Sequence, residues 1–377
     1  MSITSPSNKV NKIQIETESL HTDKLMNIPN KSPTSPATVH ITEPLPISSP
    51  KRRSIERHER SFASSLSTPI IDIEKLRENA RMGIPFKYRP TVWRIFMEYE
   101  PISREFSLST LTYKRKDYFS CLERIYGQNQ QSLWTSAQKS IIHQILIDLP
   151  RTPYKILKDN RVKKLFEHVL FVWAVRHPAS GYVQGMNDIL LPFFIVFISQ
   201  YFPSFNSNCF FDMDNVSSIS DNDLCNVEAD CYWCFSKLLD EIQDSFTKDQ
   251  PGLFRMIDML KDVVEKADPS LSRTISQQGV QYMQFSIEWM NCLFVREFSM
   301  NCLLRVWDLY LSQVSQIGHT HVYVCASLLT YLSPKLINLN QMEFILYLQS
   351  MGPDKWSSDD IETILAQAYI YQNKYKE

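Results

Sequence analysis

Apolar residues recur at helical spacing over most of the chain. One example is the set of positions Ile141, Ile142, Ile145, Leu146 and Leu149. This i, i+3, i+4 pattern predicts a helix with one buried face, which ends near Leu149 because a residue before proline is biased away from helical geometry. A second helix is predicted over residues 161–177, with Asn160 as its N-cap and Pro178 as its end. No alternating strand followed by a tight turn is found, so the pattern predicts an all-α fold.

A polar turn is predicted between two buried helices around Gln184. Glycine lies on both sides of this residue and permits tight backbone geometry, and Asn187 or Asp188 can cap the following helix. If that helix begins near Asp188, Pro192 lies close enough to its first turn to be tolerated. Gln184 is therefore presented on a turn between rigid elements, where a polar residue suggests function more strongly than on a helix face.

The composition changes near residue 70. Eight of the twenty prolines lie in the first 70 residues, whereas all seven tryptophans and all eight glycines lie after residue 80. Residues 1–69 are rich in Ser, Thr, Pro, Asn and Lys and hold too little apolar surface to offset the entropy of ordering, so we expect a disordered tail. The remaining roughly 300 residues are more than one compact core usually organises, which favours two helical lobes.

Charge and missing motifs exclude several function classes. The formal net charge is −1, which gives no electrostatic argument for a nucleic-acid partner. The longest apolar run, residues 188–198, is too short to span a bilayer, and the N-terminus lacks a signal-peptide core. We therefore expect a soluble intracellular protein without a transmembrane segment. No glycine-rich phosphate loop and no zinc-protease motif occurs, so neither a bound nucleotide nor a metal is expected.

Cysteine, histidine and basic clusters are each predicted to be structural or solvated. Cys231 and Cys234 form a lone CxxC within helical periodicity, which favours packing over metal or redox chemistry. His319 and His321 lie in a segment predicted to be a polar loop, where a solvent-exposed pair is favoured over a metal site. Residues 51–60, KRRSIERHER, are predicted to be a solvated linker rather than a membrane or adaptor site.

Arg151 and Gln184 are the candidate groups for chemistry on another molecule. Asp148 is the nearest carboxylate to Arg151, and from these residues alone a helix-terminal ion pair is the simpler interpretation. A guanidinium cannot lose its charge and matches phosphate geometry, while a glutamine amide can accept from water and donate to a phosphate oxygen. GTP hydrolysis needs two such groups, but residue type and spacing alone do not license that function.

Two motifs resemble those of the TBC-domain family of Rab GTPase-activating proteins. The family patterns I-x-x-D-x-x-R-T and Y-x-Q-G are present as Ile145, Asp148, Arg151 and Thr152, and as Tyr182, Gln184 and Gly185. Further similar stretches follow in the family's order over about residues 70 to 370, which is more specific than either short motif. The extended stretch SGYVQGMNDILLPFF is most similar to the member-22 and yeast Golgi branch.

The resemblance implies an all-α, V-shaped TBC domain of two lobes. Residues 70–226 would form the N-terminal lobe, which carries both catalytic groups, and residues 227–377 the C-terminal lobe. The domain would bind a GTP-bound Rab and accelerate GTP hydrolysis, with Arg151 as an arginine finger and Gln184 as a glutamine finger supplied in trans. No cofactor of its own is implied, because GTP and Mg²⁺ would be held by the Rab.

The resemblance also implies supporting roles and a cellular setting. Asp148 and Thr152 would orient the arginine, and the glutamine loop would be shaped by Tyr182, Gly185 and Asn187. The protein would be cytoplasmic and peripheral at the Golgi or other endomembranes, where it would regulate vesicle traffic. Serines in the tail that precede proline or follow two arginines suggest an adaptor or a kinase as a further partner.

Two alternatives and two departures from the family pattern remain. The chain could be a catalytically idle TBC fold that scaffolds a Rab, or a helical scaffold unrelated to GTPases. The family usually has tryptophan where this chain has Arg81, and a basic residue where it has Glu288. The second departure reverses a charge and bears on the local salt bridges and the partner surface. Neither touches Arg151 or Gln184.

Overall fold

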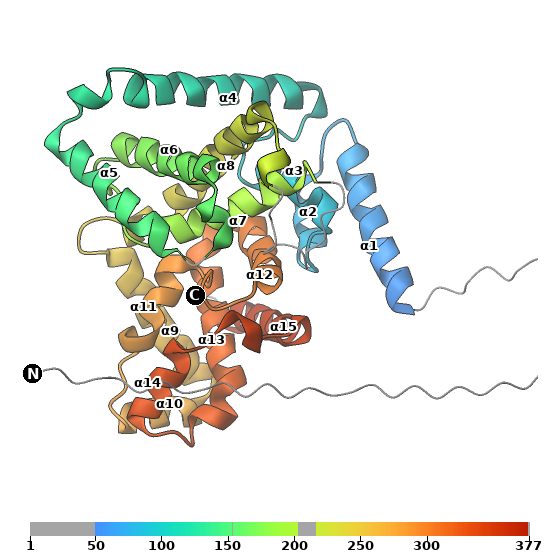
Figure 1. Ribbon diagram of the computed structural model, residues 1–377. Coiled ribbons are helices and arrows are strands. Elements are labelled where there is room, and N and C mark those ends of the chain that lie inside the picture. The colour runs from blue at the N-terminus through green and yellow to red at the C-terminus, as the bar shows by residue number, and fades with distance from the viewer. Residues whose placement is uncertain (1–49, 153, 203–215, 376–377) are drawn as a thin grey trace, which may run out of the picture. The chain divides into compact units, whose positions relative to one another are not determined.

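The computed structural model describes residues 50–152, 154–202 and 216–375. Over these ranges the chain forms α-helices and short 3₁₀ turns, and the only β pairing is an isolated bridge between Ile70 and Ser103. The predicted all-α fold is confirmed (Figure 1). The helices are α1 Pro50–Ser67, α2 Ile73–Ala80, α3 Arg89–Phe96, α4 Arg104–Tyr126, α5 Ser136–Asp148, α6 Asn160–Arg176, α7 Met186–Ser199, α8 Asp221–Glu241, α9 Pro251–Ala267, α10 Pro269–Gln277, α11 Met283–Cys292, α12 Met300–Ser312, α13 Ile317–Leu336, α14 Gln341–Gln349 and α15 Ser358–Lys374.

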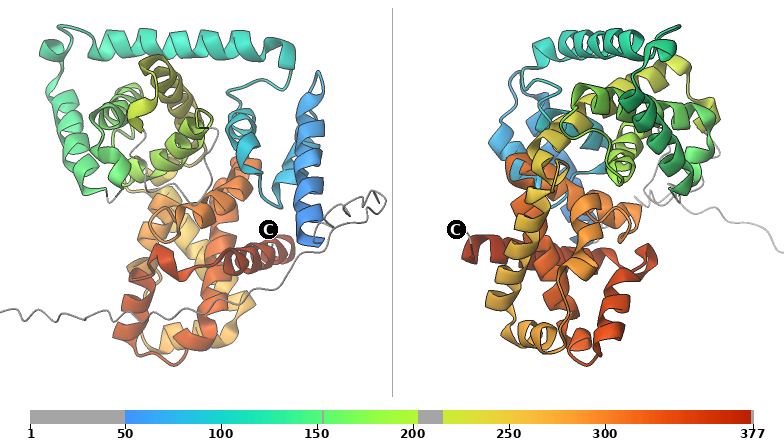
Figure 2. Two further views of the ribbon diagram at one scale, coloured as in Figure 1. Left: turned by 45° about the vertical axis from the view of Figure 1, so that its right-hand side comes forward. Right: turned by 90° about the vertical axis from the view of Figure 1, so that its left-hand side faces the viewer.

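Two groups of helices lie on either side of α7, which itself contacts α3, α6, α8 and α11 (Figure 1). On one side α4, α5, α6 and α8 pack against one another, with α4 on the side away from α13 and α15 (Figures 1 and 2). On the other side α13 packs between α9 and α15, and α11 joins α14 to α7. All fourteen residues of α7 are buried, as expected for a helix that is apolar on every face between Ile189 and Ile198. The predicted lobe boundary at residues 226 and 227 stays a prediction; α8, which spans this point, packs on α4, α6 and α7.

The end of the predicted tail is ordered, which corrects the sequence prediction for residues 50–67. This segment forms α1 and packs against α2. Phe62 and Leu66 are buried, and the Phe62 ring stacks on Tyr88 with centroids 6.1 Å apart. The predicted solvated linker is therefore part of a helix. The average composition hid this i, i+4 apolar pair, which supplies the buried surface that the helix needs. Residues 1–49 lie outside the described residues.

The helix boundaries differ from the prediction at two caps. α5 ends at Asp148, close to the predicted end. The N-cap of α6 is Asp159 rather than Asn160, because the Asp159 carboxylate accepts from the first free backbone N–H groups. α7 begins at Met186, two residues earlier than expected. Pro192 therefore lies in the second turn and is tolerated inside a fully buried helix.

The predicted histidine loop is wrong, whereas the predicted packing of the CxxC cysteines is confirmed. Cys231 and Cys234 are buried in α8. His321 lies in α13 and is fully buried, with Nδ1 2.7 Å from the Tyr310 hydroxyl. Burial lowers the pKa of His321 to about 3, because the charged imidazolium is disfavoured there. His321 is therefore a neutral core residue, while His319 is exposed.

A buried carboxylate on α12 joins two distant parts of the chain. Asp308 accepts from the Ile84 backbone N–H at 2.8 Å and from Trp93 Nε1 at 2.9 Å. Arg89 donates to both oxygens of Asp308, each at 2.9 Å. Trp307 stacks on Trp93 with ring centroids 6.1 Å apart. The Trp-Asp pair therefore fastens α3 to α12, which is the inter-helix packing role expected of large aromatic residues.

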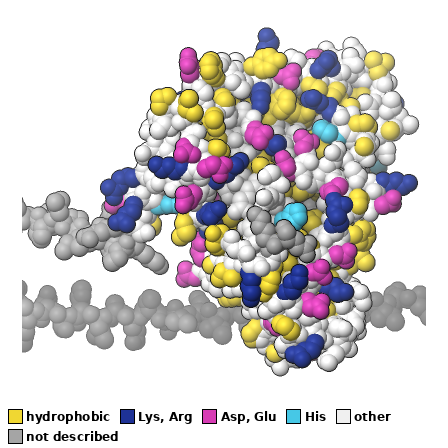
Figure 3. Space-filling view, turned by 180° about the vertical axis from the view of Figure 1, so that it is seen from behind, with side chains coloured by type: hydrophobic (Ala, Val, Ile, Leu, Met, Phe, Trp, Pro, Cys, Tyr) yellow, Lys and Arg dark blue, Asp and Glu magenta, His cyan; other side chains and the backbone are white. Residues whose placement is uncertain are grey.

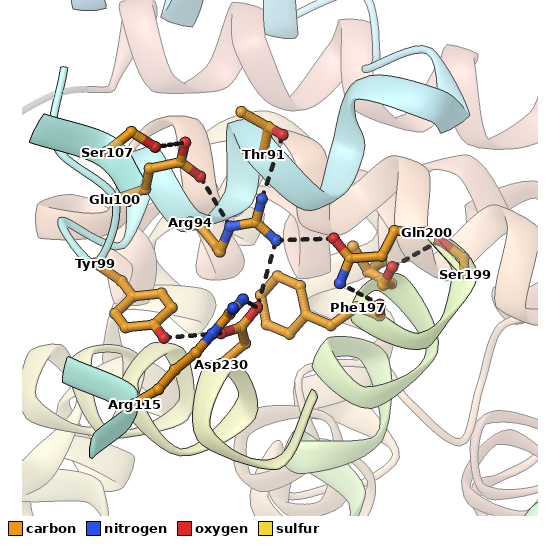
Figure 4. A network of polar contacts seen from close by, with 11 residues as sticks. Thr91, Arg94, Tyr99, Glu100, Ser107, Arg115, Phe197, Ser199, Gln200 and Asp230 are labelled. Atoms are coloured by element: carbon orange, nitrogen blue, oxygen red, sulfur yellow. Dashed lines mark hydrogen bonds and ion pairs between the residues drawn. The ribbon is translucent and has the colours of Figure 1, made fainter. Parts of the chain in front are cut away.

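A second buried carboxylate joins α3, α4 and α8 (Figure 4). Asp230 Oδ1 accepts from the Tyr99 hydroxyl at 2.7 Å and from Arg115 Nε at 2.8 Å. Asp230 Oδ2 lies 2.9 Å from Arg115 Nη2 and 3.4 Å from Arg94 Nη1. Burial and the Asp230 charge raise the pKa of Tyr99, so its hydroxyl keeps the proton that it donates. Arg94 is also buried and pairs with Glu100 at 2.8 Å.

Glu297 is a buried carboxyl group that should make folding stability depend on pH. Burial, with the Glu288 charge as second cause, raises the pKa of Glu297 to about 8. An unfolded glutamate loses its proton near pH 4, so the penalty is absent at acid pH and grows as pH rises toward 8. We expect Glu297→Gln to remove this loss, which amounts to roughly 3 to 5 kcal/mol of unfolding free energy.

Urea unfolding of the full chain at acid and alkaline pH measures this effect. The gain of Glu297→Gln over the parent should be larger at pH ~9 than at pH ~5. Glu105→Gln, a change at an exposed glutamate in the first turn of α4, is the control and should change the unfolding free energy by at most about 1 kcal/mol, equally at both pH values. An equal effect of Glu297→Gln at both pH values would contradict the buried, protonated carboxyl.

Candidate functional site

Arg151 lies in a 3₁₀ turn, η3 Leu149–Arg151, directly after α5. α5 begins with a capping box between Thr135 and Gln138. At its other end Pro150 is the second residue of η3, where its fixed φ suits a tight turn. The Arg151 side chain is 69% exposed. The turn therefore presents the guanidinium to solvent from the end of a packed helix. Pro153, the second flanking proline in the sequence, lies outside the described residues.

The ion pair between Arg151 and Asp148 exists but is loose. Arg151 Nη1 lies 3.7 Å from Asp148 Oδ1, beyond hydrogen-bond distance. The Asp148 carboxylate is 3% exposed and accepts instead from Gln144 Nε2 and from the Tyr182 hydroxyl, each at 3.1 Å. An ion pair with one highly exposed partner contributes about 0 to 1 kcal/mol. Most donors of the guanidinium therefore remain available to a second molecule.

Gln184 lies on an exposed turn between α6 and α7. Gly181 and Gly185 on either side have φ angles of 62° and 104°, in the left-handed region that favours glycine. A Cβ on Gly185 would also lie 3.3 Å from Cys292 Sγ. The Gln184 amide makes no hydrogen bond to any residue in the described ranges. Like Arg151, it is exposed at the end of a packed element.

A closed set of polar contacts lies beneath these two exposed residues. The Tyr182 hydroxyl lies 3.1 Å from Asp148 Oδ2 and 3.3 Å from Asn187 Oδ1. Asn187 Nδ2 donates to Thr152 Oγ1 at 2.8 Å, and Thr152 Oγ1 lies 3.3 Å from the Asp148 carbonyl oxygen. Burial, followed by the Asp148 charge, raises the pKa of Tyr182, which keeps its hydroxyl protonated. The structure thus brings together side chains from both predicted motifs.

Sequence reasoning missed an ion pair beside the glutamine turn. Asp188, in the first turn of α7, is completely buried and accepts from Arg296 Nε at 3.1 Å and Nη2 at 2.8 Å. Burial raises the pKa of Asp188, and Arg296 opposes that rise. The available signal was a carboxylate at the head of a long apolar run, since a buried charge requires a partner. The expected capping role of Asn187 or Asp188 is wrong, because Gly185 is the N-cap and both residues lie inside α7.

The two departures from the family pattern make local contacts. Glu288 on α11 pairs with Arg296, with Oε1 2.5 Å from Nη1. The Arg81 guanidinium lies 5.4 Å from the centroid of the Tyr369 ring on α15, within the range of a cation–π contact. The reversed charge at Glu288 is thus matched by a neighbouring cation.

The described residues contain no group of three or more His, Cys, Asp or Glu side chains placed to hold a metal ion. No helix within the described ranges has the length and apolar character required to cross a membrane. On the face shown in Figure 3, basic and acidic side chains of the described residues are interspersed. Among the predicted site groups, only Arg151 and Gln184 are exposed.

Comparison of the sequence with models of known protein families shows the family of this chain. The model of the Rab-GTPase-TBC domain family, RabGAP-TBC, matches residues 86–337, which is more than half of the chain. The chain belongs to this family. The resemblance predicted from the two short motifs is confirmed, and residues 145–152 and 182–185 both lie within the matched TBC region.

The chain is similar to several relatives of the TBC family. It is 39% identical over 310 residues to human TBC1 domain family member 22A, covering 82% of this chain and 58% of that protein. It is 35% identical over 319 residues to the GTPase-activating protein gyp1 of Schizosaccharomyces pombe, covering 84% of this chain and 61% of that protein. The chain therefore spans less than two thirds of the length of these relatives.

A solved structure shares the TBC fold of this chain. The crystal structure of the Ypt/Rab-GAP domain of Gyp1p superposes with a TM-score of 0.80 at 35% identity. The match covers 85% of this chain and 99% of that domain. The predicted similarity to the member-22 and yeast branch is confirmed.

Proposed function

We propose that this chain is a GTPase-activating protein for a Rab-family GTPase. The observation that carries the proposal is that the two candidate catalytic side chains are exposed, whereas the polar side chains that contact their segments are buried. Arg151 and Gln184 are exposed, while Asp148, Thr152 and Asn187 beneath them are buried. Exposed catalytic groups on rigid elements suit a protein that lends side chains to another molecule's reaction. Similarity to a GTPase-activating protein of Schizosaccharomyces pombe and to the Ypt/Rab-GAP domain of Gyp1p supports the same assignment.

The proposed mechanism divides the chemistry between two side chains. Arg151 donates its planar fork of N–H groups to phosphate oxygens and stabilises the charge that develops as the phosphoryl group is transferred. Gln184 accepts from the attacking water and donates to the phosphate, which orients the water for in-line attack. GTP and Mg²⁺ belong to the Rab. Asp148, Thr152 and Tyr182 orient the two segments without touching the reacting atoms.

The cellular setting follows from the same proposal. The protein acts in the cytoplasm and peripherally at the Golgi or other endomembranes, where it ends Rab signals in vesicle traffic. An adaptor or kinase that acts on the N-terminal tail is a further proposed partner, because added phosphate groups would change the charge of that tail.

Single-turnover hydrolysis by a panel of GTP-loaded Rabs tests the activity. Catalytic amounts of the full chain should accelerate one or a few members of the panel. If no Rab is accelerated although some bind the chain in a GTP-dependent way, the proposed activity is wrong and the chain is a catalytically idle scaffold. Absence of nucleotide-dependent binding would instead support a helical scaffold unrelated to GTPases.

Replacing Gln184 tests the glutamine finger. We expect Gln184→Ala to lower the accelerated rate by about 10²- to 10³-fold, as for loss of one donor that stabilises a transition state. The folding stability should not change, because the side chain is exposed and unbonded. Gln277→Ala, at an exposed glutamine of α10, is the matched control and should keep the parent rate. A fully active Gln184→Ala variant would reassign the orientation of water to another group.

A further inference from the structure

The turn between α11 and α12, residues 293–299, touches both segments that carry the exposed catalytic candidates. On the Arg151 side, the Tyr154 hydroxyl donates to the Val295 carbonyl oxygen at 2.9 Å. On the Gln184 side, Arg296 donates to Asp188 in the first turn of α7. Adjacent residues of one short turn therefore contact two segments, around Tyr154 and around Asp188, that are separated by some 30 residues in the sequence.

The backbone of this turn has an uncommon conformation. Leu293 and Phe294 have φ angles of 48° and 66°, in the left-handed region that non-glycine residues seldom adopt. Both side chains are buried, and the Leu293 carbonyl oxygen accepts from Trp307 Nε1 at 3.2 Å. Core packing thus maintains a costly conformation, and such conformations persist only where the surrounding structure imposes them. The turn is a fixed support rather than a loose connection.

Arg296 is held by carboxylates from two different helices. Its Nε and Nη2 atoms reach Asp188 on α7, while Nη1 reaches Glu288 Oε1 on α11 at 2.5 Å. Asp188 lies four residues after Gln184, and its backbone N–H donates to the Gly185 carbonyl oxygen at 3.0 Å. The position of the first turn of α7 is therefore coupled to Arg296. Planar, charge-assisted contacts of this kind fix direction as well as distance.

We propose that residues 293–297 are a clamp that sets the separation of the two finger residues. Tyr154 and Arg296 are positioning residues: the first acts through the segment that follows Arg151, and the second through the first turn of α7, which follows Gln184. Glu288 restrains Arg296 from the solvent side. This inference rests on the proposed GTPase-activating function. Because both finger side chains are exposed, their backbone segments must supply their placement, and misplacement by about 1 Å can cost about 10²-fold in rate.

Hydrogen exchange tests the clamp without any GTPase. In the full chain, Arg296→Lys keeps the charge but loses the forked contact with Asp188. We expect the amides of Met186 and Asp188, which donate to the Val183 and Gly185 carbonyl oxygens, to exchange at least about tenfold faster in this variant, because opening of the turn becomes easier. Arg305→Lys is the matched control, since Arg305 binds the Glu362 carboxylate through Nε and Nη2 and touches neither finger segment. Unchanged exchange of the Met186 and Asp188 amides in Arg296→Lys would overturn the clamp.

A double-mutant cycle separates positioning from a merely structural role. With an accelerated Rab, Arg296→Lys should lower kcat by about 10- to 100-fold while KM changes less than about threefold. In the Gln184→Ala background the same change should cost less than about twofold, because the group that it positions is absent. Tyr154→Phe should behave in the same way in an Arg151→Ala background. Additive losses would contradict positioning. A parent chain that accelerates no Rab would contradict the proposed function, while hydrogen exchange would still decide whether the clamp exists.

Discussion

Arg151→Ala should slow Rab GTP hydrolysis by about 10³- to 10⁵-fold, equivalent to roughly 4 to 7 kcal/mol of activation free energy. The variant loses a permanent charge and a planar set of donors at the position proposed to face the transferred phosphoryl group. The stability of the fold should be nearly unchanged, because the side chain is 69% exposed and its ion pair with Asp148 is 3.7 Å long. Such a pair contributes at most about 1 kcal/mol.

Single-turnover rates with and without the variant measure this effect, and thermal unfolding checks the fold. Arg77→Ala is the matched control, because Arg77 also forms an i, i+3 pair, with Glu74 at 2.8 Å. It should keep the parent rate. If Arg151→Ala retained that rate while Gln184→Ala did not, the arginine finger would have to be a different cation.

Asp230→Ala should destabilise the fold by about 3 to 5 kcal/mol, the usual cost of removing one partner from a buried ion pair. The Asp230 carboxylate is completely buried and is shared by Tyr99, Arg94 and Arg115 (Figure 4). Without it the Arg94 charge would keep, among the residues that the structure describes, only Glu100 as an anionic partner. The contacts that fasten α3 and α4 to α8 would also be lost.

Urea unfolding followed by circular dichroism measures this loss. Asp221→Ala is the control on the same helix, because Asp221 is 88% exposed and pairs with Arg161 at 3.0 Å. A surface pair of this kind should contribute only about 0.2 to 1 kcal/mol. If both variants lost the same unfolding free energy, burial of the Asp230 carboxylate would not be the reason for its effect.

The catalytic candidates could be predicted from the sequence because both lie in local motifs. The spacing of Asp148 and Arg151 is set by one helix end, and the spacing of Tyr182 and Gln184 by one turn. Local geometry of this kind depends on adjacent residues alone. Apolar periodicity was sufficient for α5 and α6 for the same reason, since the helical repeat is a property of the backbone.

The sequence predicts a disordered segment where α1 lies and an exposed loop where His321 lies. Both predictions are wrong, because burial of these residues depends on residues outside their own segment. Phe62 is buried partly by Tyr88 and His321 partly by Tyr310, and neither contact follows from a window of neighbouring residues. The N-cap of α6 was missed by one position because Asp159 and Asn160 are both good capping residues.

The sequence by itself determined the helical class, the TBC resemblance and the two exposed catalytic candidates, because each depends on short-range spacing. The tertiary structure decided which groups support them. Contacts of Tyr182 with Asp148, of Arg296 with Asp188 and of Tyr154 with Val295 join residues 34, 108 and 141 positions apart. Side chains so distant in the chain meet only when the helices have packed. The physical reason is that each buried charge or hydroxyl group needs a partner wherever it lies in the chain. Which residue becomes that partner depends on how all the helices pack.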